Sequence, residues 1–199
     1  VLMGGAAIEA PWEPDVQGLL MAWYPGMQGG HAVADVLTGE ANPSGHLPHA
    51  WPRSEADLQP FDNVSEHVTY GPLHGQTWLD AHQTEAHWPL GFGLSYSTFT
   101  HGTVTVEETA ERWVVTVPVT NQGPYDGADV VFVEGSVPGS AYPRPEALLV
   151  GFARVELAAG ASEDVTIAID RGTLDVWDDG WVREDGAVLS VVPLTRDSG

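Results

Sequence analysis

Residues 113–121, WVVTVPVTN, decide the fold of the second half of the chain. Every second residue from Trp113 to Val119 is apolar, which places these side chains on one face of an extended strand. The segment 164–170, DVTIAID, repeats the alternation with one valine and two isoleucines. Pro118 has no N–H to donate to a neighbouring strand, so it predicts an edge strand or a bulge at that point.

Further strands are expected throughout residues 101–199, separated by turn sequences such as NQGPYDG, AAGAS and two Asp-Gly pairs. Their expected ranges are 103–107, 128–134, 147–156, 174–177, 181–183 and 187–192. Short strands of this kind, about seven of them at spacings near ten residues, predict an immunoglobulin-like or fibronectin-like β-sandwich.

The first part of the chain, residues 1–58, predicts a piece of an α/β fold. Residues 16–23, VQGLLMAW, form a continuous apolar run, which is typical of a strand covered on both faces. The segment 31–39, HAVADVLTG, places apolar residues on one face of a short helix, and Gly39 stands where a left-handed glycine ends a helix. An extended piece follows at 47–51. Strand, helix and strand in this order predict a parallel crossover unit.

Two or three strands are too few for a stable sheet covered on both faces. The chain also begins at Val1 inside an apolar stretch, VLMGGAAIEAPW, which is typical of the interior of a buried strand and lacks the basic region of a signal peptide. We therefore expect a fragment of a larger protein that supplies the missing strands.

Residues 59–100 are expected to form an aromatic loop between the two parts. The stretch 52–93 has little periodicity, and a structureless loop of that length is usually functional or packed on a neighbour. All eight histidines lie between His31 and His101, so the composition changes near residue 100.

The chain carries 28 acidic and 7 basic residues, for a net charge of −21. Nucleic acid is not an expected partner, because phosphate binding needs clustered Lys and Arg. The excess of acidic residues has two explanations. It is typical of a hydrated surface that keeps a protein soluble, and also of proteins from organisms with high salt or high GC content. The absence of cysteine excludes disulfides and thiolate chemistry, and the lack of an apolar run of about 18 residues argues against a membrane helix. Localisation stays open between the cytoplasm and secretion.

Several groups have the spacing of metal ligands but lack a complete ligand set, so exposed polar positions explain them better. These groups are His31 with Asp35, His46 with His49, and Asp175 with Asp178 and Asp179. Ser44 indicates a turn rather than a nucleophile, the GFG at 91–93 lacks the context of a nucleotide loop, and Asn63 begins a glycosylation sequon. We expect neither a metal nor a cofactor.

Acidic residues in the first half are candidates for glycoside hydrolysis, which needs two carboxylates about 5–10 Å apart. The candidates are Glu9, Glu55, Glu66, Asp80 and Glu85. The sequence cannot place any two at that distance, and a surface position explains each one. Trp78 and Asp80 are the best sugar-binding pair, because an aromatic face and a carboxylate suit a pyranose. Alternatively, Trp78 pins the loop to a neighbouring domain.

Residues 22–54 contain three motifs in order, WYPGxxGG, DVLxG and NPSGxLPxxxP. This stretch resembles the glycoside hydrolase family 3 β-glucosidases. GGAAIEAPW and WPLGFGLSYSTF are similar to neighbouring stretches of that family, with Glu9 and Trp12 matching. VTNQGPYDGADVV, RPEALLVGFARVELAAGASEDVTIAI and DGWVREDG resemble the family's fibronectin type III-like C-terminal module. The resemblance covers essentially the whole chain.

The resemblance implies the last strands and helix of a parallel-sheet α/β sandwich domain, followed by the fibronectin-like domain. It also implies a retaining exo-glycosidase whose aspartate nucleophile lies in a barrel domain and whose glutamate acid/base precedes this segment. Neither residue then lies in this chain, and its partner is the rest of the enzyme, in the same or a separate chain. A stand-alone carbohydrate- or protein-binding module is the alternative.

Two stretches depart from the family pattern. HGQTWLD, residues 74–80, replaces a GYRYYD-like stretch and keeps only Gly75, an aromatic at Trp78, and Asp80. The usual lysine before Gly151 is also missing.

Overall fold

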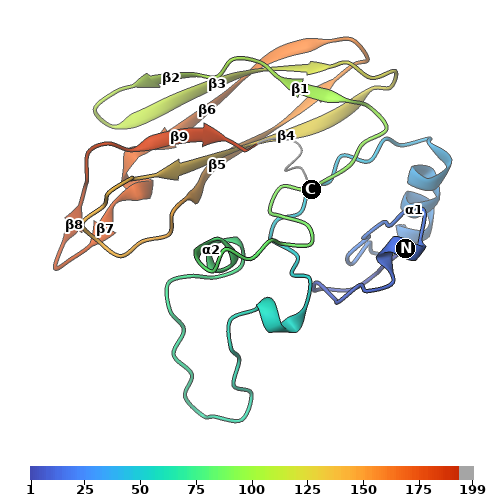
Figure 1. Cartoon of the computed structure of the whole chain (residues 1–199). Helices are drawn as coiled ribbons and strands as arrows, with labels where there is room; N and C mark the ends of the chain where they lie inside the picture. The colour runs from blue at the N-terminus through green and yellow to red at the C-terminus, as the bar shows by residue number, and fades with distance from the viewer. Residues whose placement is uncertain (193–199) are drawn as a thin grey trace.

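The computed structural model describes residues 1–192, which form an N-terminal part, residues 1–98, and a β-sandwich from residue 99 onward (Figure 1). Residues 193–199, which the sequence assigned to the second module, lie outside the described residues. The helical elements of the N-terminal part are η1 (Glu13–Asp15), α1 (Gly29–Thr38), η2 (Glu55–Asp57) and α2 (Gln76–Ala81).

The sandwich consists of two antiparallel sheets and a hairpin. One sheet contains β1 (Phe99–His101), β2 (Thr105–Glu108), β3 (Arg112–Asn121) and β6 (Ser162–Asp170). The other contains β4 (Gly127–Ser136), β5 (Leu148–Leu157) and β9 (Val188–Val191). The hairpin pairs β7 (Val176–Trp177) with β8 (Trp181–Val182), after the short helix η3 (Arg171–Leu174).

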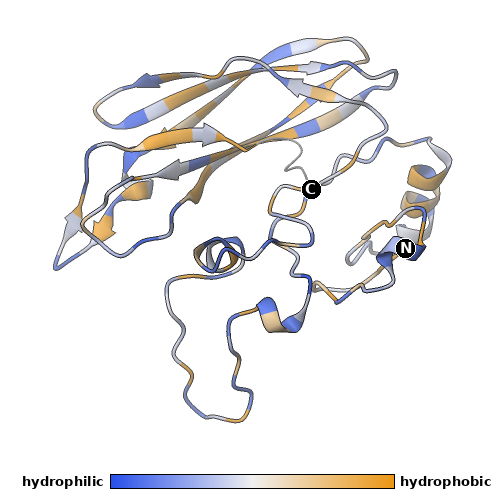
Figure 2. Ribbon diagram, viewed as in Figure 1, coloured by the Kyte–Doolittle hydropathy of each residue, from blue (hydrophilic) through white to orange (hydrophobic). Residues whose placement is uncertain are grey.

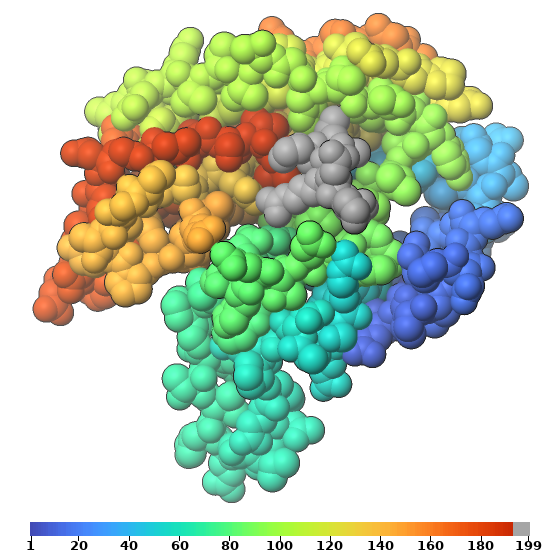
Figure 3. Space-filling model, viewed as in Figure 1, coloured from blue at the N-terminus to red at the C-terminus, as the bar shows by residue number. Residues whose placement is uncertain are grey.

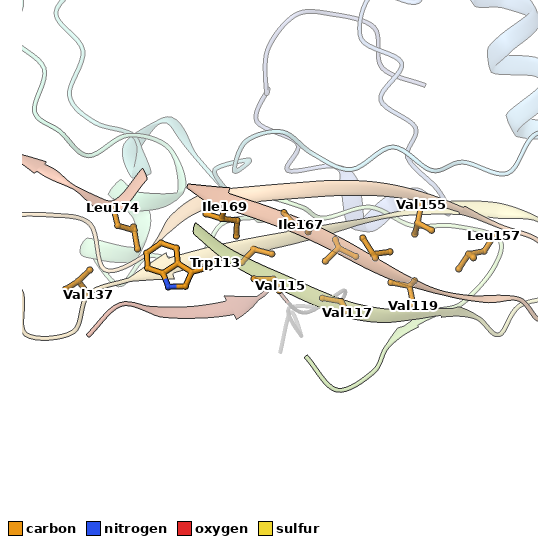
Figure 4. Packing of buried hydrophobic residues seen from close by; sticks show 13 residues of the cluster. Trp113, Val115, Val117, Val119, Val137, Val155, Leu157, Ile167, Ile169 and Leu174 are labelled. Atoms are coloured by element: carbon orange, nitrogen blue, oxygen red, sulfur yellow. The ribbon is translucent and has the colours of Figure 1, made fainter. Parts of the chain in front are cut away.

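The core lies between the two sheets, where the period-two pattern predicted it (Figure 4). Val115, Val117 and Val119 of β3 have no exposed surface. They pack with Val165 and Ile167 of β6 and with apolar residues of β4 and β5. Because each sheet turns one apolar face inward, the two faces cover each other. The predicted sandwich is confirmed, and each expected strand overlaps an observed one.

Pro118 lies in a central strand, so the expected edge position is wrong. β3 pairs with β6 on one side and with β1 and β2 on the other. The Pro118 carbonyl accepts a hydrogen bond from the Gly102 N–H at 2.7 Å, on the side of β1 and β2. Gly102 lies between those two strands, where the ladder is interrupted. The missing N–H of proline therefore faces a gap in the pairing, which is why a central strand tolerates it.

The N-terminal part contains the predicted helix but not the predicted strands. Gly39 follows α1 in the left-handed conformation, with φ of 83°, as the sequence indicated. The strand expected at 16–23 is wrong, since only a parallel bridge between Met21 and Leu2 forms. In the extended piece at 47–51, Trp51 forms an antiparallel bridge with Trp88. The predicted parallel crossover unit is therefore not formed in residues 1–192. No neighbouring strands are present there to continue a parallel ladder.

The stretch 52–93 is more ordered than the sequence predicted, because it contains η2 and α2. Between these elements, residues 61–70 are all exposed and project from the rest of the molecule (Figure 3). Leu79 of α2 is buried, so this short helix is packed on the N-terminal part rather than free. Within residues 1–192, no helix has the length and apolar character needed to cross a membrane.

Candidate functional site

Aromatic side chains form the local core of the N-terminal part. Trp51 is 1 % exposed, and its indole N–H donates to the carbonyl of Ile8 at 2.7 Å. Its ring lies 5.2 Å from that of Trp88 and 6.3 Å from that of Trp23, measured between centroids. Backbone bonds also join Trp51 to His87 and Trp88. This cluster holds together four segments of the N-terminal part, around residues 8, 23, 51 and 88.

Asn42 forms three hydrogen bonds, one to the sandwich and two within the N-terminal part. Its amide Nδ2 donates to the carbonyl of Asp126 at 3.0 Å, beside the start of β4. Its Oδ1 accepts from the Ser95 hydroxyl and from the Tyr96 N–H, both at 2.8 Å. The Tyr96 hydroxyl in turn donates to the carbonyl of Val36 in α1. One amide thus connects the NPSG turn, the GLSY stretch and the sandwich.

A second contact between the two parts is a buried cluster of two histidines and one aspartate. His101 Nε2 lies 2.8 Å from Asp129 Oδ2, and His46 Nε2 lies 3.3 Å from Asp129 Oδ1. The Asp129 side chain is 2 % exposed. His46 comes from the N-terminal part, His101 from β1 and Asp129 from β4, so the cluster bridges both sheets and the preceding segment.

The cluster changes the acidity of its members. Burial alone would raise the pKa of Asp129, but the hydrogen bonds from His101 and His46 outweigh it and hold that pKa well below its usual range. Burial alone would lower the pKa of His46, yet the bonds to Asp129 and to the Gly91 carbonyl raise it above 6.5. The geometry therefore favours a charged pair in a site with little water.

Trp78 and Asp80, the pair predicted to bind sugar, both lie in α2 and are half-buried. The Trp78 indole N–H donates to the carbonyl of Asp57 at 3.1 Å, and its ring lies 3.9 Å from that of His82. Asp80 Oδ1 accepts from Gln76 Nε2 at 2.7 Å. The indole contact ties α2 to η2 within the N-terminal part.

The other candidate carboxylates are distributed over the N-terminal part, where Glu9 and Glu55 are neighbours. Glu9 accepts a hydrogen bond from the backbone N–H of Glu55 at 2.6 Å. Glu85 lies 3.4 Å from Arg53, with both side chains largely exposed. Glu66 is in the exposed loop. The contacts of Glu9 and Glu85 are thus with a backbone N–H and with an arginine.

The residues that have the spacing of metal ligands in the sequence make other contacts in the structure. His31 and Asp35 are both exposed on α1. His49 Nδ1 bonds to the carbonyl of Ala50, while His46 belongs to the buried cluster. Asp175 forms a two-point ion pair with Arg183, at 2.9 and 3.0 Å. Among residues 1–192, no three His, Asp or Glu side chains gather as metal ligands would.

Sequence reasoning missed the residues that join the two parts. Asp129 falls in register with Val131 and Val133, which face the core, so the period-two pattern already placed a charge inward. That observation is the signal that could have indicated a buried ion pair. Nothing local indicated that His46 and His101 would be its partners, because 83 and 28 residues separate them from Asp129 in the sequence.

The motifs that meet at this contact also match known protein families. Residues 1–96 match the glycosyl hydrolase family 3 C-terminal domain, and residues 130–192 match the fibronectin type III-like domain. This chain belongs to glycoside hydrolase family 3. The resemblance that its WYPG and NPSG motifs indicated is thereby confirmed.

Similar proteins of the family are β-glucosidases. "Probable beta-glucosidase H" of Aspergillus fumigatus is 37 % identical over 202 residues, which cover 94 % of this family 3 chain and 24 % of that protein. The structure of β-glucosidase from Kluyveromyces marxianus in complex with glucose is 32 % identical, with a TM-score of 0.90, covering 98 % of this chain and 25 % of that one. β-Glucosidase 3B from Thermotoga neapolitana is 31 % identical, with a TM-score of 0.88, covering 94 % and 28 %.

The family 3 chain matches the C-terminal portion of these β-glucosidases. It spans about a quarter of the length of the curated relatives, 24 % in the first case.

Proposed function

We propose that this chain serves as the C-terminal part of a β-glucosidase-like enzyme, in which it supports the domain that carries the active site. The observation that carries the proposal is the match of nearly the whole chain to the C-terminal quarter of β-glucosidases. In the proposed enzyme, a carboxylate nucleophile displaces the leaving group from a terminal β-linked sugar and water then releases the sugar. Both reactive carboxylates belong to the preceding barrel and α/β segments.

Apolar surface on the N-terminal part supports a role in a larger assembly. Tyr24 is 82 % exposed and Met27 fully so, at the entrance of α1. Leu37, on the helix itself, is 61 % exposed, and much of α1 is apolar (Figure 2). Large apolar side chains exposed in this way are typical of a surface that contacts another part of a protein. We infer that the segments at 2–4 and 20–23 join a parallel sheet whose other strands lie in the rest of the enzyme, and that α1 packs on this sheet.

We propose three regions that follow from this role. Residues 1–58 complete the α/β domain, residues 59–100 connect it to the sandwich, and residues 101–199 form the fibronectin-like domain. The hydrogen bond from Asn42 to Asp126 and the buried contacts of Asp129 support a fixed arrangement of the first and third regions.

The purified chain is expected to hydrolyse an aryl β-glucoside no faster than buffer. A chimera tests the supporting role. The matching C-terminal quarter of the Aspergillus fumigatus relative is replaced with this chain, and hydrolysis is compared with the same relative lacking that quarter. We expect the chimera to be active and the truncated enzyme to be inactive. Turnover by the purified chain, or equal activity of the truncated enzyme, would contradict the proposal.

We propose further that Trp78 and Asp80 contact the carbohydrate from the rim of the active site. Their half-buried position on α2 leaves part of each side chain accessible. In the active chimera, Asp80→Asn is expected to raise KM several-fold with little change in kcat, because it weakens binding to a sugar hydroxyl equally in the ground and transition states. Glu66→Gln, in the exposed loop, is the matched control. An unchanged KM for Asp80→Asn would contradict sugar binding and would indicate that Trp78 and Asp80 have only a structural role.

A further inference from the structure

The hydrogen-bond geometry of His46 determines its protonation state. Its Nδ1 lies 2.7 Å from the carbonyl oxygen of Gly91, which can only accept, so Nδ1 carries a proton. Its Nε2 lies 3.3 Å from Asp129 Oδ1, which as a carboxylate oxygen also accepts. A neutral imidazole has one N–H, so it can satisfy only one of these acceptors. The arrangement is complete only when His46 is an imidazolium.

The remaining neighbours of the cluster are consistent with this charge. His101 Nε2 donates to the second oxygen of Asp129. Among the described residues, two titratable groups interact with Asp129: His46, from the segment after Asn42, and His101, from β1. The other neighbours of the pair are uncharged. His46 contacts the Gly91 carbonyl and the Phe132 ring, and Asp129 accepts from the Val130 N–H. The protonated His46 and the Asp129 carboxylate therefore form a buried pair of opposite charge.

We propose that His46, Asp129 and His101 form a proton-dependent clamp that holds the N-terminal part against the β-sandwich, closed while His46 is an imidazolium and opened when His46 loses its proton. On deprotonation, one contact of His46 must fail, because a bare ring nitrogen then faces either the Gly91 carbonyl or the Asp129 carboxylate. The clamp acts in this chain itself and does not depend on the proposed enzyme.

The direction of the pH dependence follows from the two ionisations. The pKa of His46 is raised above 6.5, so its contribution to stability is fully present below pH 6.5 and is lost as the pH rises through the raised value. The pKa of Asp129 is lowered below 3.8, so its contribution is present above pH 3.8 and is lost in stronger acid. The clamp is therefore tightest in the mildly acidic range between these limits.

The test begins with the protonation state of His46 in the 199-residue chain. Long-range proton–nitrogen NMR of 15N-histidine-labelled protein reports whether each ring nitrogen carries a proton. At pH 6 we expect both nitrogens of His46 to be protonated, with a titration midpoint above 6.5. A neutral His46 at pH 6, or a midpoint at or below 6.5, would overturn the proposal. The same result is expected if the segment that carries His46 does not pack on the sandwich, so that case also counts against the proposal.

Hydrogen exchange of backbone amides then tests whether deprotonation opens the contact. Two amides report on the segment beside His46: Leu47 N–H bonds to Phe92, and Gly91 N–H bonds to Leu47. After correction for the intrinsic pH dependence of exchange, their protection is expected to fall as His46 deprotonates. Protection of Val117, in the sandwich core, is expected to stay constant. Equal behaviour of all three amides would exclude a local opening.

Substitutions separate the charge of His46 from its mere presence. His46→Lys keeps a cation near Asp129 at all pH values up to about 10, so the loss of protection between pH 6 and 9 is expected to disappear. His31→Gln, on the exposed surface of α1, is the matched control and is expected to keep the full pH dependence. A pH dependence that persists unchanged in His46→Lys would refute the clamp.

Discussion

Replacing Trp51 with alanine is expected to unfold the N-terminal part while the β-sandwich stays folded. Trp51 is 1 % exposed and contacts the rings of Trp23, His49 and Trp88. Loss of such a buried ring costs about 3–5 kcal/mol. The N-terminal part has little other core, so this loss exceeds what its remaining contacts can compensate. Chemical denaturation followed by tryptophan fluorescence should show a separate early transition in Trp51→Ala.

Trp51→Phe is the matched variant for this prediction. It keeps a ring in the cluster but loses the hydrogen bond from the indole to the Ile8 carbonyl. We expect a smaller loss, about 0.5–1.5 kcal/mol, because the ring stays packed and only one hydrogen bond is removed. A loss as large as that of Trp51→Ala would show that the hydrogen bond, rather than the packing of the ring, holds this region together.

Asn42→Ala is expected to detach the N-terminal part from the sandwich at a second point. The substitution removes one hydrogen bond to the sandwich, from Asn42 to Asp126, and two within the N-terminal part, to Asn42 from Ser95 and Tyr96. At about 1 kcal/mol for each bond, the free energy of unfolding should fall by roughly 3 kcal/mol. Hydrogen exchange should show faster exchange at the Tyr96 amide, with no change in the core of β3.

Asn63→Ala is the control for Asn42→Ala, because Asn63 lies in the exposed loop at 61–70. It is expected to change the free energy of unfolding by less than about 0.5 kcal/mol. If Asn42→Ala has an equally small effect, the two parts are held together by the other contacts, chiefly those of Asp129. The double variant Asn42→Ala with His46→Lys would then measure how far the two contacts depend on each other.

The two contacts explain why the motifs of the first half lie where they do. The NPSG turn supplies Asn42, and His46 follows directly after it. The GFGLSY stretch supplies the Gly91 carbonyl and the Tyr96 amide that these side chains meet. The motifs that indicated the family thus carry the contact between the N-terminal part and the sandwich. The same arrangement fits the supporting role that we propose for this chain.

Local patterns were sufficient for the elements that depend on neighbouring residues. Alternation in 113–121 and 164–170 predicted β3 and β6, because a strand turns successive side chains to opposite faces. The apolar face of 31–37 and Gly39 predicted α1 and its end for similarly local reasons. The strand expected at 16–23 failed because an apolar run forms a strand only when partners for its backbone are available, and residues 1–192 supply only Leu2 beside Met21.

By itself, then, the sequence determined the sandwich, the first helix and the family, since each depends on short-range periodicity or on contiguous motifs. Only the tertiary structure decided that Asn42 meets Asp126 and that His46 and His101 meet Asp129. Those contacts join residues 28–84 positions apart, and no local preference specifies such a pairing. They form because a buried charge or amide is stable only where the fold brings it a partner.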